Sequence, residues 1–333
     1  MKNGIAVAGS LILDQHYMVE TYPEQGKLTN IRGTDRSVGG TGNLIMDLAK
    51  IDETLPVKVS AILGTGGNGR FVKNTLSQYP NIDLCNIVER GDTSMTMVMN
   101  AMDNNQRTFF YLPAGSDEYD MECIDWERIQ ADIFQLEYLL LMKKIDEPDP
   151  EYGTHAARIL HDARAHGMKT SIDMVTTSDG KGGEIVKASL KYTDYCTINE
   201  LEAEMITGIR ILENGVLDDG KAYAALKAIK ACGVSSWVVI HSPSCGYGLD
   251  CVTGETVKVK SLALPKGYIK GTTGAGDAYC AGILYGAYRE MSIESAMKLG
   301  TASAACSLSD TSGTEGMRSY EEVRKVYETY RVE

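Results

Sequence analysis

The segment that decides the fold is GTTGAGD at residues 271–277, which runs directly into AYCAGILYGAY at residues 278–288. Small residues enter a helix here straight after a loop. The first N–H groups of a helix have no partner within it, and they lie at the positive end of the helix dipole. Because small residues let a ligand approach the backbone, this helix start is suited to anionic oxygen and above all to phosphate.

Asp277 stands beside this predicted phosphate site. A carboxylate there repels an incoming phosphate, so it is a poor choice for mere binding. It is well suited to remove a proton from an attacking hydroxyl group. The alternative is a glycine-rich helix start that packs against a sheet, with Asp277 as a first-turn partner of the helix dipole.

The composition is that of an ordinary globular chain. The 333 residues are 43% hydrophobic and 23% charged, which excludes wholesale disorder, collagen-like repeats and a multi-span membrane protein. The net charge is −12 and the basic residues do not cluster, so we expect no nucleic-acid partner. No apolar run approaches the ~18 residues of a membrane span, so we expect no membrane contact either.

The eight cysteines form no C-x-x-C pair, and several lie in apolar segments. A chain of this length needs no disulfide, so we expect a reducing, cytoplasmic location. The N-terminal segment MKNGIAVAGSLILD mimics a short signal peptide. Only Lys2 precedes the apolar run and no convincing cleavage site follows, so we interpret residues 5–9 as a first buried strand.

Short apolar runs alternate with longer amphipathic runs along the chain. The expected strands are residues 5–9, 57–63, 138–142, 169–174, 195–198 and 237–240. The expected helices are residues 41–51, about 70–78, 153–166, 200–206 and 218–231, with further helices from residue 274 onward. This alternation indicates βαβ units, a mainly parallel sheet and an α/β fold.

Two segments, at about 14–38 and 93–112, break this rhythm. The first is polar and lacks a helical period. The second is typical of two strands around the turn Asp103-Asn104-Asn105, which is a hairpin signal. We expect both segments to form a small sheet, a lid, over the main sheet within a single domain spanning residues 1–333.

The hairpin carries three methionines on one alternating face: Met95, Met97 and Met99. We expect Phe109 and Tyr111 to lie opposite them on the second strand. This face is either the small core of the lid or a dimer contact, since an apolar edge sheet needs covering. The alternative is an apolar wall against a substrate.

Taken together, these segments resemble the PfkB/ribokinase family of carbohydrate kinases. GTTGAGDAYCAG is similar to the family's D-T-x-G-A-G-D signature, and SVGGTGNLIMDLAKI at 37–51 is similar to its G-G-x-x-x-N-x-A signature. AVAGSLILD at 6–14 resembles the first strand, AILGTGGNGRFV at 61–72 the strand-turn-helix after the lid, and TINELEAEMITG at 197–208 the N-x-x-E motif.

The resemblance implies a ribokinase-like doubly wound sheet with helices on both faces and transfer of the γ-phosphoryl group of ATP to a sugar-type hydroxyl. It implies these roles: Asp277 as base; Gly274, Ala275 and Gly276 as anion hole; Asp14, Gly39, Gly40 and Asn43 as substrate-binding residues; Asn199, Gly246, Thr272 and Thr273 as nucleotide-binding residues; and Glu202 as the organiser of Mg²⁺ through water. A hydrated Mg²⁺ keeps most of its waters and needs only one or two oxygen side chains from the protein. The alternative for Asn199 and Glu202 is a helix N-cap with a first-turn carboxylate. The resemblance also implies a small sugar-type substrate. Because lids in the family often pair, we further expect a homodimer through the lid.

The chain departs from the family pattern in three places. Gly39-Gly40 and Asn43 enclose Thr41 and Gly42 alone, one residue fewer than in the family. Gly271 replaces an Asp that helps to hold a monovalent cation in potassium-dependent members, so we expect a weaker potassium dependence. The strand at 237–240 leads into His241-Ser242-Pro243, where Pro243 lacks a backbone donor. His241 is either a phosphate contact or a structural residue.

A competing motif is GTGGNG at 64–69, which follows a strand and opens a helix. With Glu89 about 20 residues further on, it is typical of dinucleotide binding and predicts an NAD-binding oxidoreductase. That interpretation leaves the 274–277 motif and the lid hairpin unexplained. A nucleoside kinase of the same fold also stays open, as does a non-catalytic sugar or nucleotide sensor, although a sensor would not need Asp277.

Overall fold

A computed structural model describes residues 3–104, 106–177 and 182–332. Its main sheet has nine strands in the order β17-β16-β15-β12-β11-β8-β1-β4-β5. In that order their bounds are Thr256–Lys260, Cys245–Asp250, Trp237–His241, Tyr195–Asn199, Lys169–Met174, Ile133–Leu139, Ile5–Gly9, Val57–Leu63 and Ile82–Glu89. All neighbours from β15 to β5 are parallel, and β16 and β17 add an antiparallel edge.

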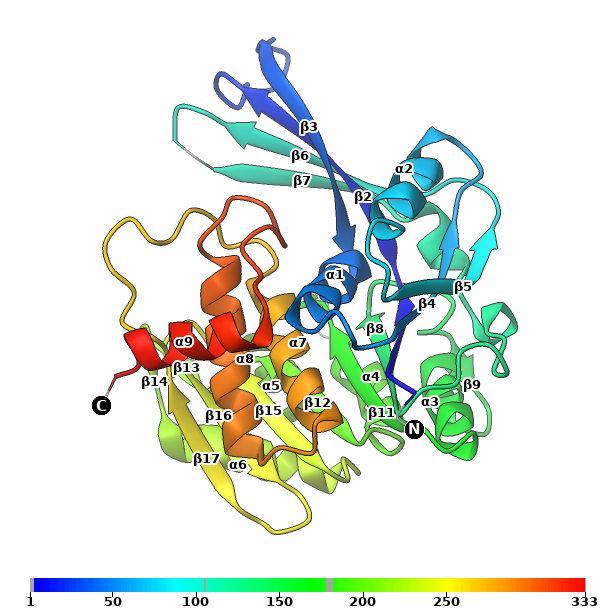
Figure 1. The fold of residues 1–333 in the computed structure, drawn as a ribbon, viewed down its shortest axis with the longest axis vertical. Helices are drawn as coiled ribbons and strands as arrows, with labels where there is room; N and C mark the ends of the chain where they lie inside the picture. The colour runs from blue at the N-terminus through cyan, green and yellow to red at the C-terminus, as the bar shows by residue number, and fades with distance from the viewer. Residues whose placement is uncertain (1–2, 105, 178–181, 333) are drawn as a thin grey trace.

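Helices cover both faces of this sheet (Figure 1). On one face lie α1 (Thr41–Ile51), α2 (Gly67–Leu76), α7 (Ala275–Tyr288), α8 (Ile293–Ser307) and α9 (Tyr320–Tyr330). On the other lie α3 (His155–Ala165), α4 (Gly182–Leu190), α5 (Glu200–Thr207) and α6 (Asp219–Ala231). The predicted doubly wound α/β fold, with a mainly parallel sheet and helices on both faces, is confirmed.

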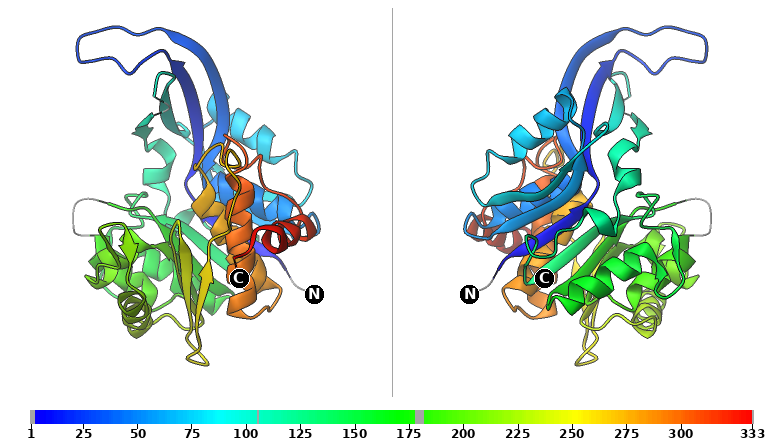
Figure 2. Two further views of the ribbon diagram at one scale, coloured as in Figure 1. Left: turned by 90° about the vertical axis from the view of Figure 1, so that its left-hand side faces the viewer. Right: turned by 90° about the vertical axis from the view of Figure 1, so that its right-hand side faces the viewer.

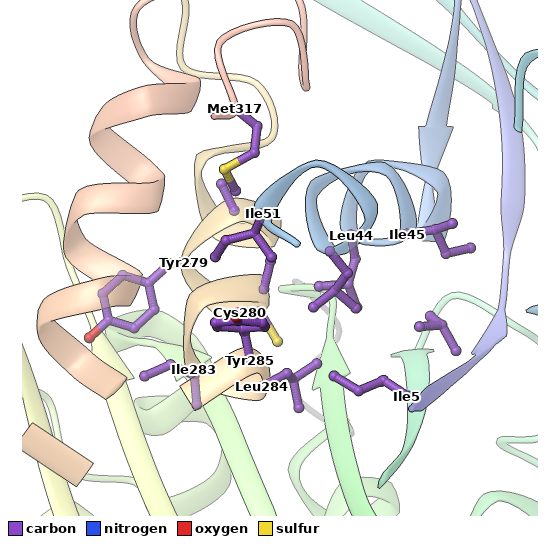
Figure 3. Packing of buried hydrophobic residues seen from close by; sticks show 14 of the residues in the cluster. Ile5, Leu44, Ile45, Ile51, Tyr279, Cys280, Ile283, Leu284, Tyr285 and Met317 are labelled. Carbon is purple, nitrogen blue, oxygen red and sulfur yellow. The ribbon is translucent and has the colours of Figure 1, made fainter. Parts of the chain in front are cut away.

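The two helices that carry the site motifs pack on each other. Leu44 and Ile51 of α1 lie beside Cys280 and Leu284 of α7, within the hydrophobic cluster drawn in Figure 3. All of these side chains are excluded from water, and their burial provides most of the driving force that holds the helices together. The packing fixes the starts of α1 and α7 relative to each other.

A second sheet, here called the lid sheet, has four strands in the order β3-β2-β6-β7. Its strands are β2 (Leu11–Val19), β3 (Ile31–Gly40), β6 (Ser94–Ala101) and β7 (Arg107–Leu112). Figures 1 and 2 show it projecting from the main body beyond the start of α1. The predicted sheet from residues 14–38 and 93–112 is present, and of the predicted turn Asn105 lies outside the described residues.

Two details of the sequence prediction were wrong. The strand expected at 138–142 is β8, Ile133–Leu139, because the buried polar side chains of Gln135 and Glu137 interrupt the apolar run that marks a central strand. In the lid hairpin, Met97 pairs with Phe110, whereas Phe109 pairs with Val98. Since paired residues share a face, Phe109 and Tyr111 lie on the side away from the methionines.

Candidate active site

The candidate site lies where the connections of the main sheet change direction. From β1 the chain continues to β4 and β5 on one side, whereas β8 pairs with the other side of β1. Ligands of open α/β sheets bind at the carboxyl ends of strands at such a switch point. The sequence places Asp14 beyond the end of β1 and Tyr138 near the end of β8.

The N-terminus of α7 begins at Gly274, which is the N-cap residue. Its φ of 76° is left-handed, and a side chain there would also clash with the carbonyl oxygen of Gly313. Only glycine meets both conditions easily. The N–H of Ala278 donates to the Gly274 carbonyl at 2.8 Å, as the first turn of a helix requires. The backbone N–H groups that come before Ala278 therefore have no partner within the helix.

Asp277 is held at both carboxylate oxygens. The Asn43 amide donates to Oδ2 at 2.9 Å, and the Tyr138 hydroxyl donates to Oδ1 at 2.6 Å. Burial raises the pKa of Asp277, and the hydrogen bonds from Tyr138 and Asn43 oppose that rise because they favour the ionised form. The two hydrogen bonds hold the carboxylate at a fixed position beside the start of α7.

The expected substrate-binding residues lie together around Asp277. The Asp14 carboxylate lies so close to the backbone of Gly39 that any side chain at that glycine would collide with it. Gly40 is the N-cap of α1, and Asn43 is in the first turn of the same helix. The one-residue shortening of the loop therefore does not remove Asn43 from the site, since it reaches Asp277.

Further carboxyl groups crowd the same region. Burial, reinforced by the charge of Asp277, raises the pKa of Asp14 to about 6. Burial likewise raises the pKa values of Asp47, Glu137 and Asp173 well above the ordinary range, with Asp277 contributing in each case. Neighbouring buried carboxyls cannot all ionise, so burial and mutual repulsion favour the neutral form of these three.

Asn199 and Glu202 form a complete capping box at the start of α5. The Asn199 side-chain oxygen accepts from the N–H groups of Leu201 and Glu202, each at 2.9 Å, and Glu202 Oε2 accepts from the Asn199 N–H at 2.8 Å. The Thr176 hydroxyl donates to Glu202 Oε1 at 3.1 Å. The helix N-cap interpretation of this pair is thus realised in the fold.

The residues near Glu202 also fit a hydrated Mg²⁺. Burial raises the pKa of Glu202 to about 7, and its charge raises that of the nearby Asp173. A cation would relieve both. Among the described residues no group of three or more His, Cys, Asp or Glu side chains could hold a metal by itself. A site with few protein ligands suits Mg²⁺, which keeps several waters and binds substrate phosphates.

The other expected nucleotide residues lie in the loop before α7 and in β16. Thr272 and Thr273 lie in the loop before α7, where the Thr273 hydroxyl accepts a hydrogen bond from Arg107 of the lid sheet. Gly246 is buried in β16, and a side chain there would collide with the Tyr279 hydroxyl. Packing therefore accounts for Gly246, which pairs in the main sheet with His241, the residue that also pairs with Asn199.

His241 fits its structural interpretation. Its ring centroid lies 5.0 Å from that of Tyr279, with the planes inclined by 31°. Burial lowers the pKa of His241 to about 4, so the imidazole is neutral near pH 7. A neutral ring offers a phosphate no charge.

A cavity of about 580 Å³ separates the lid sheet from the main body. The lid contributes one alternating face to it, including Asp14, His16, Ser37 and Arg107. The body contributes Asn43, Lys270, Thr273 and the loop residues 311–313. This size is within the range of small-molecule sites.

The competing GTGGNG motif serves the fold. The Gly64 N–H donates to the Thr93 hydroxyl at 2.9 Å, and a side chain at Gly69 would clash with the Gly64 carbonyl. Glu89 pairs with Lys73 of α2. The glycines therefore allow the strand, the helix and the lid connection to approach closely, which leaves the dinucleotide interpretation without support.

Sequence reasoning missed Glu137, Tyr138, Arg107 and Lys270 as site residues. The misplaced β8 hid the first two, because the predicted strand begins at Tyr138 whereas the observed strand ends beside it. The signal available was polar Gln135 and Glu137 within an otherwise apolar run. Arg107 gave no signal, since its partner Thr273 is 166 positions away.

Comparisons with known proteins agree with this geometry. The sequence profile described as pfkB family carbohydrate kinase matches residues 2–319. Ribokinase of Haemophilus influenzae is 24% identical over 312 residues, covering 92% of this chain and 93% of that protein. A 5-dehydro-2-deoxygluconokinase of Listeria monocytogenes is 31% identical over 134 residues, which is 39% of either protein.

Solved structures show the same fold. Ribokinase from Arabidopsis thaliana, complexed with ribose and ATP, has a TM-score of 0.80 at 17% identity and covers 98% of this chain and 99% of its own. Ribokinase from Thermotoga maritima has a TM-score of 0.79 at 19% identity, with coverage of 98% and 99%. The fold and site thus define a sugar kinase, a phosphotransferase with an alcohol acceptor. The chain belongs to the pfkB family of carbohydrate kinases.

Proposed function

We propose that this kinase transfers the γ-phosphoryl group of ATP to a hydroxyl of a small sugar-type acceptor, with Asp277 as the base. The observation that carries the proposal is Asp277 itself. Asp277 lies in the first turn of α7, where the backbone N–H groups have no partner within the helix. Its two carboxylate oxygens accept hydrogen bonds from Asn43 and Tyr138.

In the proposed reaction, the acceptor lies between the lid sheet and the main body, where Asp14 and Asn43 orient its hydroxyls. Closure of the lid excludes water from the reaction. The acceptor O–H gives its proton to Asp277 while its oxygen bonds to the γ-phosphorus, and the bond to the bridging oxygen of ADP breaks. The amides of Gly274, Ala275 and Gly276 bind the negative oxygens of the transferred group.

The nucleotide would lie along the loop that carries Thr272 and Thr273, with Asn199 at the start of α5 beside its phosphates. Gly246 remains a proposed nucleotide-binding residue, since His241 pairs with both Gly246 and Asn199 in the main sheet. Glu202 would hold Mg²⁺ through water, and the ion would neutralise phosphate charge. Glu202 can do so while its second oxygen continues to cap α5.

A sugar-type acceptor is favoured over a nucleoside by the cavity lining. Among the described residues that line it, His16 carries the single aromatic ring, whereas Asp14, Ser37, Asn43 and Asn100 offer hydrogen bonds. A nucleobase is usually bound by stacking, and a polyol is bound by hydrogen bonds. The lining therefore resembles a polyol site.

The experiment is an acceptor panel with ADP release as the readout. We expect release that depends on both ATP and one class of sugar, with no consumption of NAD or NADP. Ligand binding without turnover of any sugar, sugar acid or nucleoside would instead indicate a sensor. Turnover of nucleosides alone would indicate the nucleoside kinase.

We also propose that the chain forms a homodimer through the lid sheet in the cytoplasm. Phe110 and Leu112, on the lid face shared with Met95 and Met97, are 44% and 48% exposed. Such exposed apolar side chains on a sheet favour a covering partner. All eight cysteines are free thiols, as expected in a reducing compartment. Within the described part of the chain, no helix is long and apolar enough to cross a membrane.

A further inference from the structure

Two cationic side chains face the acceptor cavity from opposite sides. Arg107 is the first residue of β7 in the lid sheet, and Lys270 belongs to the loop that leads into α7. Both line the cavity that also contains Asp14 and Asn43, and both line a neighbouring opening beside Gly271. Neither residue has a part in the reaction described above.

These cations lack an acidic partner. In the described ranges, no carboxylate lies within ion-pair distance of Arg107 or Lys270, whereas exposed cations such as Arg32 and Lys73 have glutamate partners. The whole chain carries a net charge of −12, so carboxylates are plentiful. Two carboxylates, Asp14 and Asp35, also line the cavity, yet neither forms an ion pair with Arg107 or Lys270 in the described ranges, so both cations keep donors for a bound anion.

The pairing of the lid strands gives the separation of Arg107 from Asp14 along the strand direction. Arg107 pairs across the lid sheet with Asn100, which pairs with Met18, and Asp14 lies four residues before Met18 on the same face. Four residues of strand span roughly 13 Å. A guanidinium that reaches into the cavity leaves room for a monosaccharide between itself and Asp14.

The guanidinium already has one neutral partner, the hydroxyl of Thr273. That bond uses one N–H group and leaves further N–H donors, which form no other hydrogen bond within the described residues. Arginine binds carboxylates and phosphates through two parallel N–H groups, and a lysine beside it adds a point charge. The site is thus suited to one anionic group of the acceptor.

We propose that the acceptor is an acidic sugar, whose carboxylate or phosphate is bound by Arg107 and Lys270 while its hydroxyls are bound by Asp14 and Asn43. This inference rests on the proposed function and specifies its substrate class. The transferred phosphoryl group does not require these cations, because the amides of residues 274–276 are placed to receive it.

The first test compares acceptors that differ in one charge: glucose with gluconate and with glucose 6-phosphate, and fructose with 2-ketogluconate and with fructose 6-phosphate. Binding is measured by calorimetry in the presence of a non-hydrolysable ATP analogue, and turnover by ADP release. We expect an acid to bind ~10- to 100-fold more tightly than its neutral counterpart, as charge-assisted hydrogen bonds do. Comparing the sugar acids with the sugar phosphates shows which anionic group the site binds.

The second test uses Arg107→Gln and Lys270→Gln, with Lys266→Gln as the control. Lys266 is an exposed cation of the same loop and does not line the cavity. We expect the first two variants to lose most of the preference for the acid, through the KM of the acid, and the control to keep it. The KM of ATP should remain within about threefold of the wild-type value.

The outcomes separate this inference from the proposed function. Equal or tighter binding of the neutral sugars overturns the inference even if they are phosphorylated, and the kinase function then stands. Failure of every acid to bind also overturns it. A loss of kcat in Arg107→Gln that is the same for neutral and acidic acceptors, with a raised KM for ATP, would place Arg107 on the phosphoryl group instead.

Discussion

Replacing Tyr138 with phenylalanine should move the pH dependence of catalysis. The phenol donates to Asp277 Oδ1 at 2.6 Å, and Tyr138 is only 8% exposed, so no water easily replaces it. A hydrogen bond to a charged group contributes about 1.5–3 kcal/mol, and a pKa difference of one corresponds to about 1.4 kcal/mol. Removing the phenol should therefore raise the pKa of Asp277 and lower the rate on the acidic limb by roughly 10- to 100-fold.

The sign of the effect follows from the role of the base. Asp277 accepts a proton only when ionised, so a higher pKa moves the acidic limb of the kcat/KM profile to higher pH. Below that limb, Tyr138→Phe should lose about tenfold in rate for every increase of one in the pKa of Asp277. Above the limb, the variant should approach the wild-type rate, because Asn43 still holds the second oxygen.

The assay is kcat/KM for ADP release across the pH range, with Tyr119→Phe as the matched control. Tyr119 is fully buried, and its hydroxyl lies 2.7 Å from that of Ser60, so its hydrogen bond is with Ser60 and not with Asp277. Both variants should lose similar stability, but only Tyr138→Phe should move the limb. An unmoved limb in Tyr138→Phe, or the same movement in both variants, would refute the reasoning.

Three further predictions concern the metal, the monovalent cation and the buried acids. Glu202→Gln should raise the Mg²⁺ concentration for half-maximal rate several-fold at an unchanged melting temperature, because glutamine can still complete the capping box; an unchanged Mg²⁺ titration would show that the metal role is misplaced. Since Gly271 has no carboxylate, potassium should activate less than tenfold over tetramethylammonium at fixed ionic strength, a difference of ~1.4 kcal/mol in barrier; larger activation would contradict this. Burial raises the pKa of Asp47, and neither of its carboxylate oxygens has a hydrogen-bond partner within the described chain. The contribution of neutral Asp47 to the free energy of unfolding should therefore be present at acidic pH and decline as the pH rises through that raised pKa. Asp47→Asn should flatten this decline in the free energy of unfolding, and an equally steep decline would exclude Asp47 as its source.

The parts of the fold that could be predicted are those with local signals. The helix at Thr41–Ile51 and the strand at Lys169–Met174 match their predicted bounds, since each combines apolar periodicity with turn residues at its ends. The start of α7 could also be predicted, because a glycine with positive φ and a run of small residues leaves a clear pattern.

The parts that could not be predicted depend on distant contacts. Tyr138 and Asp277 are 139 positions apart, and neither residue type signals the other. Gly246 illustrates a second limit, since a glycine that accommodates Tyr279 has the same appearance in a sequence as one that accommodates a nucleotide. In the lid, a hairpin was recognisable from composition, but its register depends on pairing that alternation alone does not fix.

The most direct test of the central claim is the kcat of Asp277→Asn, measured together with its dissociation constant for ATP. Asparagine keeps the size of the side chain but cannot accept the acceptor's proton as a carboxylate does. The account predicts a fall in kcat of ~10²- to 10⁴-fold, with ATP affinity within about threefold of wild type. A variant that keeps more than a tenth of the wild-type kcat would contradict the assignment of Asp277 as the base.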